Sequence, residues 1–246
     1  MPLGALLAWI SLAHAQTDEI QVYDAGITAP GQFNLTLHNN FTPSGRTQAA
    51  IPGGVVPDHA LNGVPEFAYG VTDWFEAGVY AGIYTLTRAG GLLFDGAKLR
   101  ALLVVPHAHE RLFFYGVNFE LSYNTAHWAS RRYAGEIRPI VGVHLGRVDL
   151  IANPIVDTDF NGLGKLDFAP AARIACGLTN RFTVALEHYA DFGPVEHFAP
   201  HSDRSQTLFA VLDYGNNAGG IEFGVGRGLT RAADGVVVKL MWMHDF

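Results

Sequence analysis

The chain has 246 residues, of which 49% are hydrophobic and 16% are charged, with a formal net charge of −7 at pH 7. This acidic balance and the absence of basic clusters argue against a nucleic-acid-binding protein. A single cysteine, Cys176, excludes an internal disulfide framework. Beyond the N-terminus, no apolar run reaches the roughly 18 residues that a membrane-spanning helix needs. The hydrophobic residues must therefore be distributed by alternation.

Residues 1–15 have the features of a secretory signal peptide. Leu3 to Leu12 is a short apolar stretch, and Ala13-His14-Ala15 provides the small-x-small pattern that precedes a cleavage site. A signal peptide normally has Lys or Arg before its apolar stretch, and none is present here. Either the N-terminus of the sequence is truncated or the signal peptide is atypical. A buried N-terminal helix is the alternative. We expect residues 16–30 to form a short periplasmic lead-in and residues 31–246 to form the folded domain.

From residue 31 onward, apolar and polar residues alternate with the period of two that is typical of β-strands. The segment 113–124 is the clearest case, because its apolar residues take one parity while Asn118, Glu120 and Ser122 take the other. Similar segments recur along the chain, at 33–38, 66–71, 75–84, 98–105, 113–124, 136–145, 149–156, 165–174, 182–187, 208–214, 221–226 and 236–246. We therefore predict an all-β protein with about 12 strands, although ten or fourteen also fit, because predicted boundaries are uncertain by 2–4 residues.

The charges within these segments nearly all fall on the polar parity. A soluble β-sandwich, the rival fold, also alternates, but its apolar face is a packed core of Val, Ile and Leu. Here the apolar parity is rich in Ala, Phe and Tyr, which favours a lipid-facing wall around a polar interior. The predicted fold is a closed antiparallel transmembrane β-barrel with a meander topology. Its expected lumen-lining residues are Lys98, Arg100, Glu120, Glu136, Arg138, Lys165, Arg173, Glu187, Asp213, Glu222 and Lys239.

The connections between the predicted strands alternate in length. Short connections, such as Thr72-Asp73 and Gly146-Arg147, alternate with long ones, such as 40–63. Outer-membrane barrels have short turns on one rim and longer loops on the other. A sandwich has no physical reason to sort its loops in this way. The loop pattern therefore supports the barrel and an outer-membrane location.

Three stretches resemble parts of known outer-membrane proteins. The segment Lys239 to Phe246 resembles the C-terminal signal that the barrel-assembly machinery reads, although Met241 and His244 depart from its pattern. The stretches Tyr69 to Val79 and Phe223 to Gly226 resemble transporter-like barrels grouped with the phenol meta-pathway proteins. This resemblance implies an outer-membrane barrel that transports small compounds, aromatic ones among them, and that contacts outer-membrane lipid and the assembly machinery.

Three functions remain open from the sequence. Opposite charges in a narrow lumen should pair, because an unpaired buried charge is costly, and the paired charges could form the selective lining of a channel or a structural plug. An enzyme acting on lipid would need a Ser-His pair or a metal. His188 lies near Glu187 and Asp191, but without a nucleophile motif. The loop residues His197 and His201 are poorly spaced as metal ligands. We expect a narrow channel or transporter for small solutes, with neither catalytic residues nor a metal or cofactor.

Overall fold

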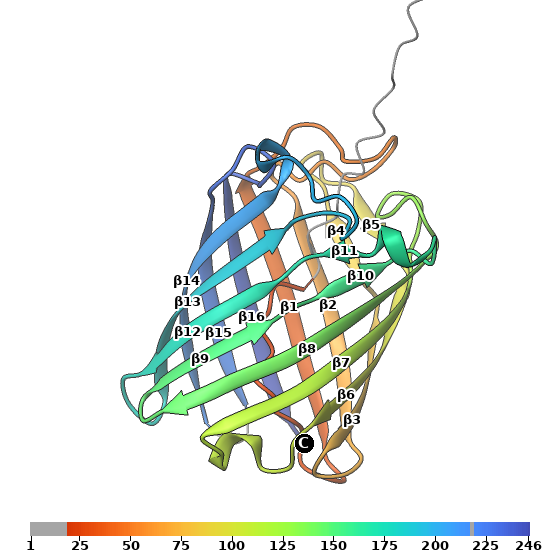
Figure 1. The fold of residues 1–246 in the computed structure, drawn as a ribbon. Coiled ribbons are helices and arrows are strands. Elements are labelled where there is room, and N and C mark those ends of the chain that lie inside the picture. Colours follow the sequence, from red (N-terminus) through yellow and green to blue (C-terminus); the bar gives the residue numbers. More distant parts are fainter. Residues whose placement is uncertain (1–18, 217–218) are drawn as a thin grey trace, which may run out of the picture.

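The computed structural model describes residues 19–216 and 219–246. These residues form a closed antiparallel β-barrel in which strands that follow one another in the sequence pair around the wall (Figure 1). The uninterrupted strands are β1 (Phe33–Ser44), β2 (Leu61–Gly70), β7 (Phe113–Tyr123), β8 (Tyr133–Leu145), β13 (Phe182–Asp191), β14 (Ser205–Asn216), β15 (Gly219–Gly228) and β16 (Val236–Asp245).

Each of the remaining barrel strands consists of two segments. These pairs are β3 (Phe75–Ala81) with β4 (Tyr84–Leu86), β5 (Leu92–Phe94) with β6 (Ala97–Val104), β9 (Val148–Asn153) with β10 (Val156–Thr158), and β11 (Asp167–Phe168) with β12 (Ala171–Gly177). The described segments therefore make up 12 barrel strands, which confirms the predicted fold class and meander order. Pro154 and Pro170 lie in two of the interruptions, where the missing N–H costs no ladder hydrogen bond.

The first and last strands close the barrel. β1 pairs with both β2 and β16, and Leu37 stands opposite Pro65 on one side and Trp242 on the other. At one end of this seam the Phe33 amide donates to the Phe246 carbonyl at 3.0 Å, and the Phe246 amide donates to the Phe33 carbonyl at 2.9 Å. The final residue of the chain therefore takes part in closing the wall.

The wall is apolar outside and mostly polar inside. Outward-facing residues such as Ile174 and Leu186 are more than half exposed, at 58% and 52%, whereas Glu187 and Lys239 are fully buried at 0%. A continuous exposed apolar surface of this kind is unfavourable in water and suits contact with lipid. Among the described residues, no helix is long and apolar enough to span a membrane.

The two rims of the barrel differ. Short turns, including 71–74 and 146–147, lie at the end where Phe33 and Phe246 meet, which we call the terminal rim (Figure 1). Longer connections, including 45–60, 124–132, 192–204 and 229–235, lie at the other end, which we call the loop rim. The three short 3-10 helices, η1 (Ala108–Glu110), η2 (Leu163–Lys165) and η3 (His201–Asp203), lie in connections between strands.

The segment before β1 lies in the lumen. A periplasmic lead-in is expected for residues 16–30, but Glu19, Val22, Tyr23 and Ala25 are buried inside the barrel. The physical reason is that these residues fill a part of the lumen whose wall is itself apolar. We call residues 19–31 the lumen segment. The signal peptide expected for residues 1–15 lies outside the described residues.

Because its outer face contacts lipid, the barrel should not tolerate a charge at the middle of that face. We predict that Leu186→Lys, at mid-height of β13, lowers the free energy of unfolding by about 2–4 kcal/mol. Urea titration of the protein folded into lipid vesicles measures this loss. The matched variant Leu163→Lys, at an 82% exposed position in η2, should leave the unfolding midpoint unchanged. Equal behaviour of the two variants would contradict a lipid-facing β13.

Candidate functional site

One group of charges lies on the inner faces of β12 to β16. Arg173 forms ion pairs with Glu187 and Asp213 and lies 3.1 Å from Glu222. The Lys239 ammonium lies 2.5 Å from Glu187 and 2.6 Å from Glu222. The two basic groups therefore share two carboxylates, and each charge except Asp213 has more than one partner. Such sharing offsets the cost of removing the charges from water.

A second group lies on the opposite wall. Arg100 forms ion pairs with Glu76 and, at 2.7 Å, with Glu66, which also hydrogen-bonds His38 Nε2 at 3.0 Å. Beside this group, Arg138 Nε donates to Glu136 at 2.7 Å. Lys98 lies 3.9 Å from Glu120. The two groups place opposite charges around the whole inner surface.

All but one of the predicted lumen residues lie on the inner face of the wall. The exception is Lys165, which is exposed in η2 beyond the end of β11. The alternating pattern suggested a strand beginning at residue 165, but Gly162 has a φ of 111° and the chain makes a 3-10 turn there before the strand begins at Asp167. The polar parity of the sequence also includes His38, Glu66 and Glu76, and all three belong to the second group.

Tyr23 anchors the lumen segment at the centre of the barrel. Its backbone is held by Asn153, which accepts from the Tyr23 amide at 2.7 Å and donates to the Tyr23 carbonyl at 3.0 Å. Its hydroxyl lies 2.9 Å from that of Tyr80. The guanidinium carbons of Arg138 and Arg100 lie 4.4 Å and 5.6 Å from the centre of its ring. The ring thus connects the lumen segment to charges on the wall.

Further polar contacts fix the segment on both sides of Tyr23. Arg138 donates to the carbonyl of Gln21 at 3.1 Å and lies 3.6 Å from Glu19. Lys239 donates to the carbonyl of Ile20 at 3.1 Å, and the Thr28 amide donates to Glu76 at 2.6 Å. These contacts use residues of both charged groups. The segment therefore occupies the lumen at the level of the charges.

Toward the terminal rim, the inner wall becomes apolar. Val22, Tyr23 and Ala25 of the lumen segment pack in one buried cluster against wall residues that include Leu102, Val104, Phe114, Ile140 and Ile151. The sequence contains a signal for this arrangement, because both parities are apolar at that end of several strands, as in 102–105 and 139–141. An inner wall that is apolar requires an apolar partner, and the lumen segment supplies it.

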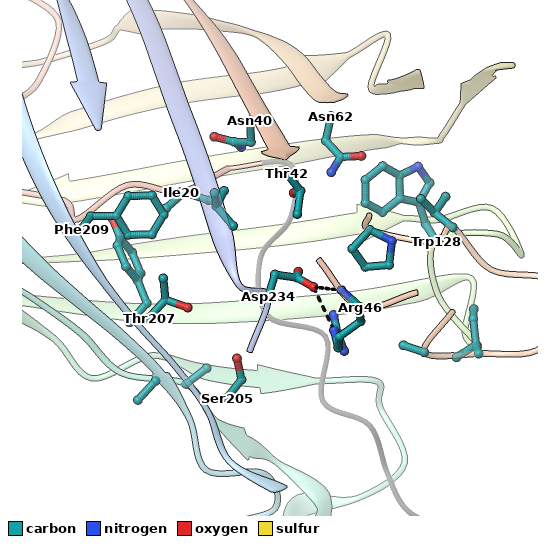
Figure 2. A pocket seen from close by; sticks show the side chains of 18 of the residues that line it. Ile20, Asn40, Thr42, Arg46, Asn62, Trp128, Ser205, Thr207, Phe209 and Asp234 are labelled. Carbon is teal, nitrogen blue, oxygen red and sulfur yellow. Dashed lines mark hydrogen bonds and ion pairs between the residues drawn. The ribbon is translucent and has the colours of Figure 1, made fainter. Parts of the chain in front are cut away.

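Toward the loop rim, the lumen opens into a cavity with an empty volume of about 1250 Å³, open solvent included, which we call the outer cavity. Ile20, Phe209 and Tyr189 form its inner end, and polar side chains such as Asn40 and Thr207 line its wall (Figure 2). Gly226 provides space for the Phe209 ring, because a Cβ at that position would lie 2.5 Å from the ring.

The loop 45–60 borders the outer cavity and is tied to its neighbours. The Arg46 amide and Nε donate to Asp234 at 2.8 Å and 3.2 Å (Figure 2). Asp58 accepts from the Gly45 amide at 3.1 Å, from Arg88 at 2.8 Å and from His59 Nδ1 at 2.8 Å. The hydrogen bond from Gly45, followed by that from His59, holds the pKa of Asp58 below its ordinary value.

The residues considered for catalysis and metal binding are not assembled into a site. His188 lies on the outer parity of β13 opposite Ala172 and Leu208, and no hydrogen bond joins it to Glu187 or Asp191. Within the described parts of the chain, no group of His, Cys, Asp and Glu has the geometry of a metal site.

No protein-family model matches the chain, and no curated protein matches its sequence. Among solved structures, an outer membrane channel from Pseudomonas putida F1 is similar with a TM-score of 0.61 and 15% identity, over 93% of this chain and 100% of that one. LpxR from Salmonella typhimurium has a TM-score of 0.43 at 8% identity, over 86% and 99% of the two chains. The translocator domain of the autotransporter NalP from Neisseria meningitidis has a TM-score of 0.46 at 9% identity, over 87% of this chain and 88% of that one.

The likeness to the channel shows that this chain has the fold of outer-membrane β-barrels. The other two similarities are too weak to carry an argument. Outer-membrane barrels with this fold have both chain ends of the barrel at the periplasmic side, where short turns lie. The terminal rim therefore corresponds to the periplasmic end and the loop rim to the extracellular end.

The shared carboxylates should be essential for the stability of the lumen. We predict that Glu187→Gln lowers the free energy of unfolding by about 3 kcal/mol, because it leaves Arg173 and Lys239 with fewer buried counter-charges. Urea unfolding followed by tryptophan fluorescence measures the loss. Glu196→Gln, at an exposed position of the loop 192–204, is the control and should behave as the wild type. A stable Glu187→Gln barrel would show that the ion pairs contribute little.

The contacts of Asp58 should depend on pH. A carboxyl whose pKa is lowered in the folded state stabilises that state above the unfolded pKa of about 3.9, and the stabilisation is lost as pH falls through the folded pKa. We therefore expect the loop 45–60 to keep its protection against amide hydrogen exchange at neutral pH and to lose it in Asp58→Asn. Unchanged protection in this variant, relative to Asp73→Asn in a short turn, would argue against the anchor.

Proposed function

We propose that this protein is an outer-membrane channel for small solutes, closed in the present state by its own lumen segment. The observation that carries the proposal is the way residues 19–31 occupy the lumen. They form no strand of the wall. Side-chain contacts and an apolar cluster hold them, and at the end next to β1 the Gly31 amide donates to the Gly70 carbonyl of β2 at 2.8 Å. A segment held in this way can leave without breaking the hydrogen-bonded wall. The ladder of the wall runs through strands β1 to β16, and the segment is not one of them.

The lumen has the composition expected of a conducting path. Polar and charged side chains line it at the level of Tyr23, and the outer cavity leads from the loop rim to this level. Rings of charged side chains are a general means by which pores select solutes. The likeness to an outer membrane channel supports the fold on which this proposal depends.

A narrower proposal follows from the resemblance of Tyr69–Val79 and Phe223–Gly226 to the barrels grouped with the phenol meta-pathway proteins. The solutes would then include small aromatic compounds. The aromatic inner end of the outer cavity, formed by Phe209 and Tyr189, supports this proposal. Uptake of phenol-class compounds into vesicles that contain the protein tests it, and uptake equal to that of empty vesicles would contradict it.

Weakening the lumen segment should open the channel. We predict that Tyr23→Ala, which removes the contacts to Tyr80, Arg138 and Arg100, raises the open probability in planar bilayers at least about tenfold, because each 1.4 kcal/mol shifts an equilibrium by that factor. Tyr133→Ala, which removes a 58% exposed tyrosine from the outer surface, is the matched control and should conduct as the wild type does.

Heat-modifiable migration on a gel shows whether each variant is folded. A folded Tyr23→Ala protein that stays electrically silent, and whose vesicles take up no solute, would contradict the channel and favour the alternative of a structural barrel with a permanent plug. Equal opening in the two variants would show that the lumen segment does not control conduction.

A further inference from the structure

The outer cavity combines an apolar end with a polar wall. Ile20, Tyr189, Phe209 and Val237 provide apolar surface, and Ser205 and Thr207 provide hydroxyl groups. The rings of Tyr189 and Phe209 meet edge to face, with their centres 5.6 Å apart. A cavity of this composition suits a compact molecule with an apolar body and a few polar atoms.

The charged residues of the lining indicate whether the polar group of such a molecule would be positive, neutral or negative. Arg46 is compensated, because Asp234 accepts hydrogen bonds from its amide and its guanidinium. Lys239, beneath the two aromatic rings, is compensated by Glu187 and Glu222. Asp157 of β10 also lines the cavity, and no described residue hydrogen-bonds or ion-pairs with its carboxylate. In the described part of the chain, the lining therefore leaves one acidic group, the carboxyl of Asp157, without a basic partner of its own.

The surroundings of Asp157 are acidic as well. Glu136, Asp167 and Asp191 act on its charge, while Arg138 is the opposing cation, and Arg138 is already bonded to Glu136 and close to Glu19. Basic side chains of the lumen are outnumbered by acidic ones. The basic ones are Lys98, Arg100, Arg138, Arg173 and Lys239, and the acidic ones are Glu19, Glu66, Glu76, Glu120, Glu136, Glu187, Asp213 and Glu222. Field lines in a narrow low-dielectric lumen add to this preference for cations.

We infer that the outer cavity binds small organic cations, with an ammonium group near Asp157 and an apolar body against Phe209 and Tyr189. This inference rests on the proposed function in one respect, since the bound cation would be the solute that the channel admits. Aromatic side chains assist because their ring faces attract ammonium groups, as they already attract Lys239, which lies 5.5 Å from the centre of Phe209. Anionic molecules of the same size would meet the unpaired carboxylate and be disfavoured.

Three ligands that share a benzene ring but carry a positive, a neutral or a negative polar group test this inference. Benzylammonium, benzyl alcohol and benzoate are titrated separately into the full-length protein in detergent micelles, with protein-free micelles as the blank, and binding is followed by calorimetry. We expect benzylammonium to bind about tenfold more tightly than benzyl alcohol and benzoate to bind most weakly, since 1.4 kcal/mol corresponds to a factor of ten in affinity.

The variants assign the preference to Asp157. Asp157→Asn should bind benzylammonium and benzyl alcohol equally, and Asp157→Glu should keep the preference. Asp159→Asn, just after the end of β10 and outside the cavity lining, should resemble the wild type. Heat-modifiable migration confirms that each protein is folded. Binding of benzoate as tight as that of benzylammonium, or an unchanged preference in Asp157→Asn, would overturn the inference.

The experiments distinguish a failure of the cation site from a failure of the proposed channel. A barrel that binds benzylammonium selectively but never conducts would contradict the proposed channel and leave the cation site in place. A conducting barrel without the charge preference would contradict the cation site alone.

Discussion

The wall of this barrel depends on one constraint: within lipid, every backbone N–H and C=O group must find its partner in the protein. No water is present in the hydrocarbon region to replace a missing hydrogen bond, so an open sheet edge is excluded. The pairing of β1 with β16, completed by the reciprocal hydrogen bonds of Phe33 and Phe246, satisfies this constraint. Once the wall is closed, alternate side chains must face either lipid or lumen, and the charges are confined to the lumen.

Confinement of the charges creates a second requirement, because each charge must be compensated in a narrow space. Glu187 and Glu222 each contact both Arg173 and Lys239. Side chains therefore join neighbouring strands and also strands that share no backbone ladder, such as β13 and β16. The lumen segment makes use of the same groups, through Lys239 and Arg138. The charges that stabilise the wall therefore also hold the element that closes the lumen, and the closed state couples wall and segment.

The lumen is divided along its axis. The terminal rim is filled by an apolar cluster, the middle by ion pairs around Tyr23, and the loop rim by the outer cavity. A solute entering from the loop rim would meet the cavity first, and then the charges and the lumen segment at the same level. The cavity and the lumen segment adjoin, since Ile20 of the segment forms part of the cavity's inner end.

Alternation along the chain was sufficient to predict the barrel and the inner face of its strands, because a period of two assigns each residue to a side of the wall wherever a strand continues. It left the strand number open between ten and fourteen, and the structure gives 12. Alternation failed for Lys165, where a 3-10 turn around Gly162 ends the periodicity. The apolar inner residues Leu102, Phe114 and Ile140 indicate in sequence that something apolar fills the lumen, but they do not identify the filler. Only the tertiary structure places residues 19–31 there and leaves Asp157 unpaired beside a cavity. The reason is that contacts across the lumen join residues more than a hundred positions apart, such as Tyr23 and Asn153, and no local pattern encodes them.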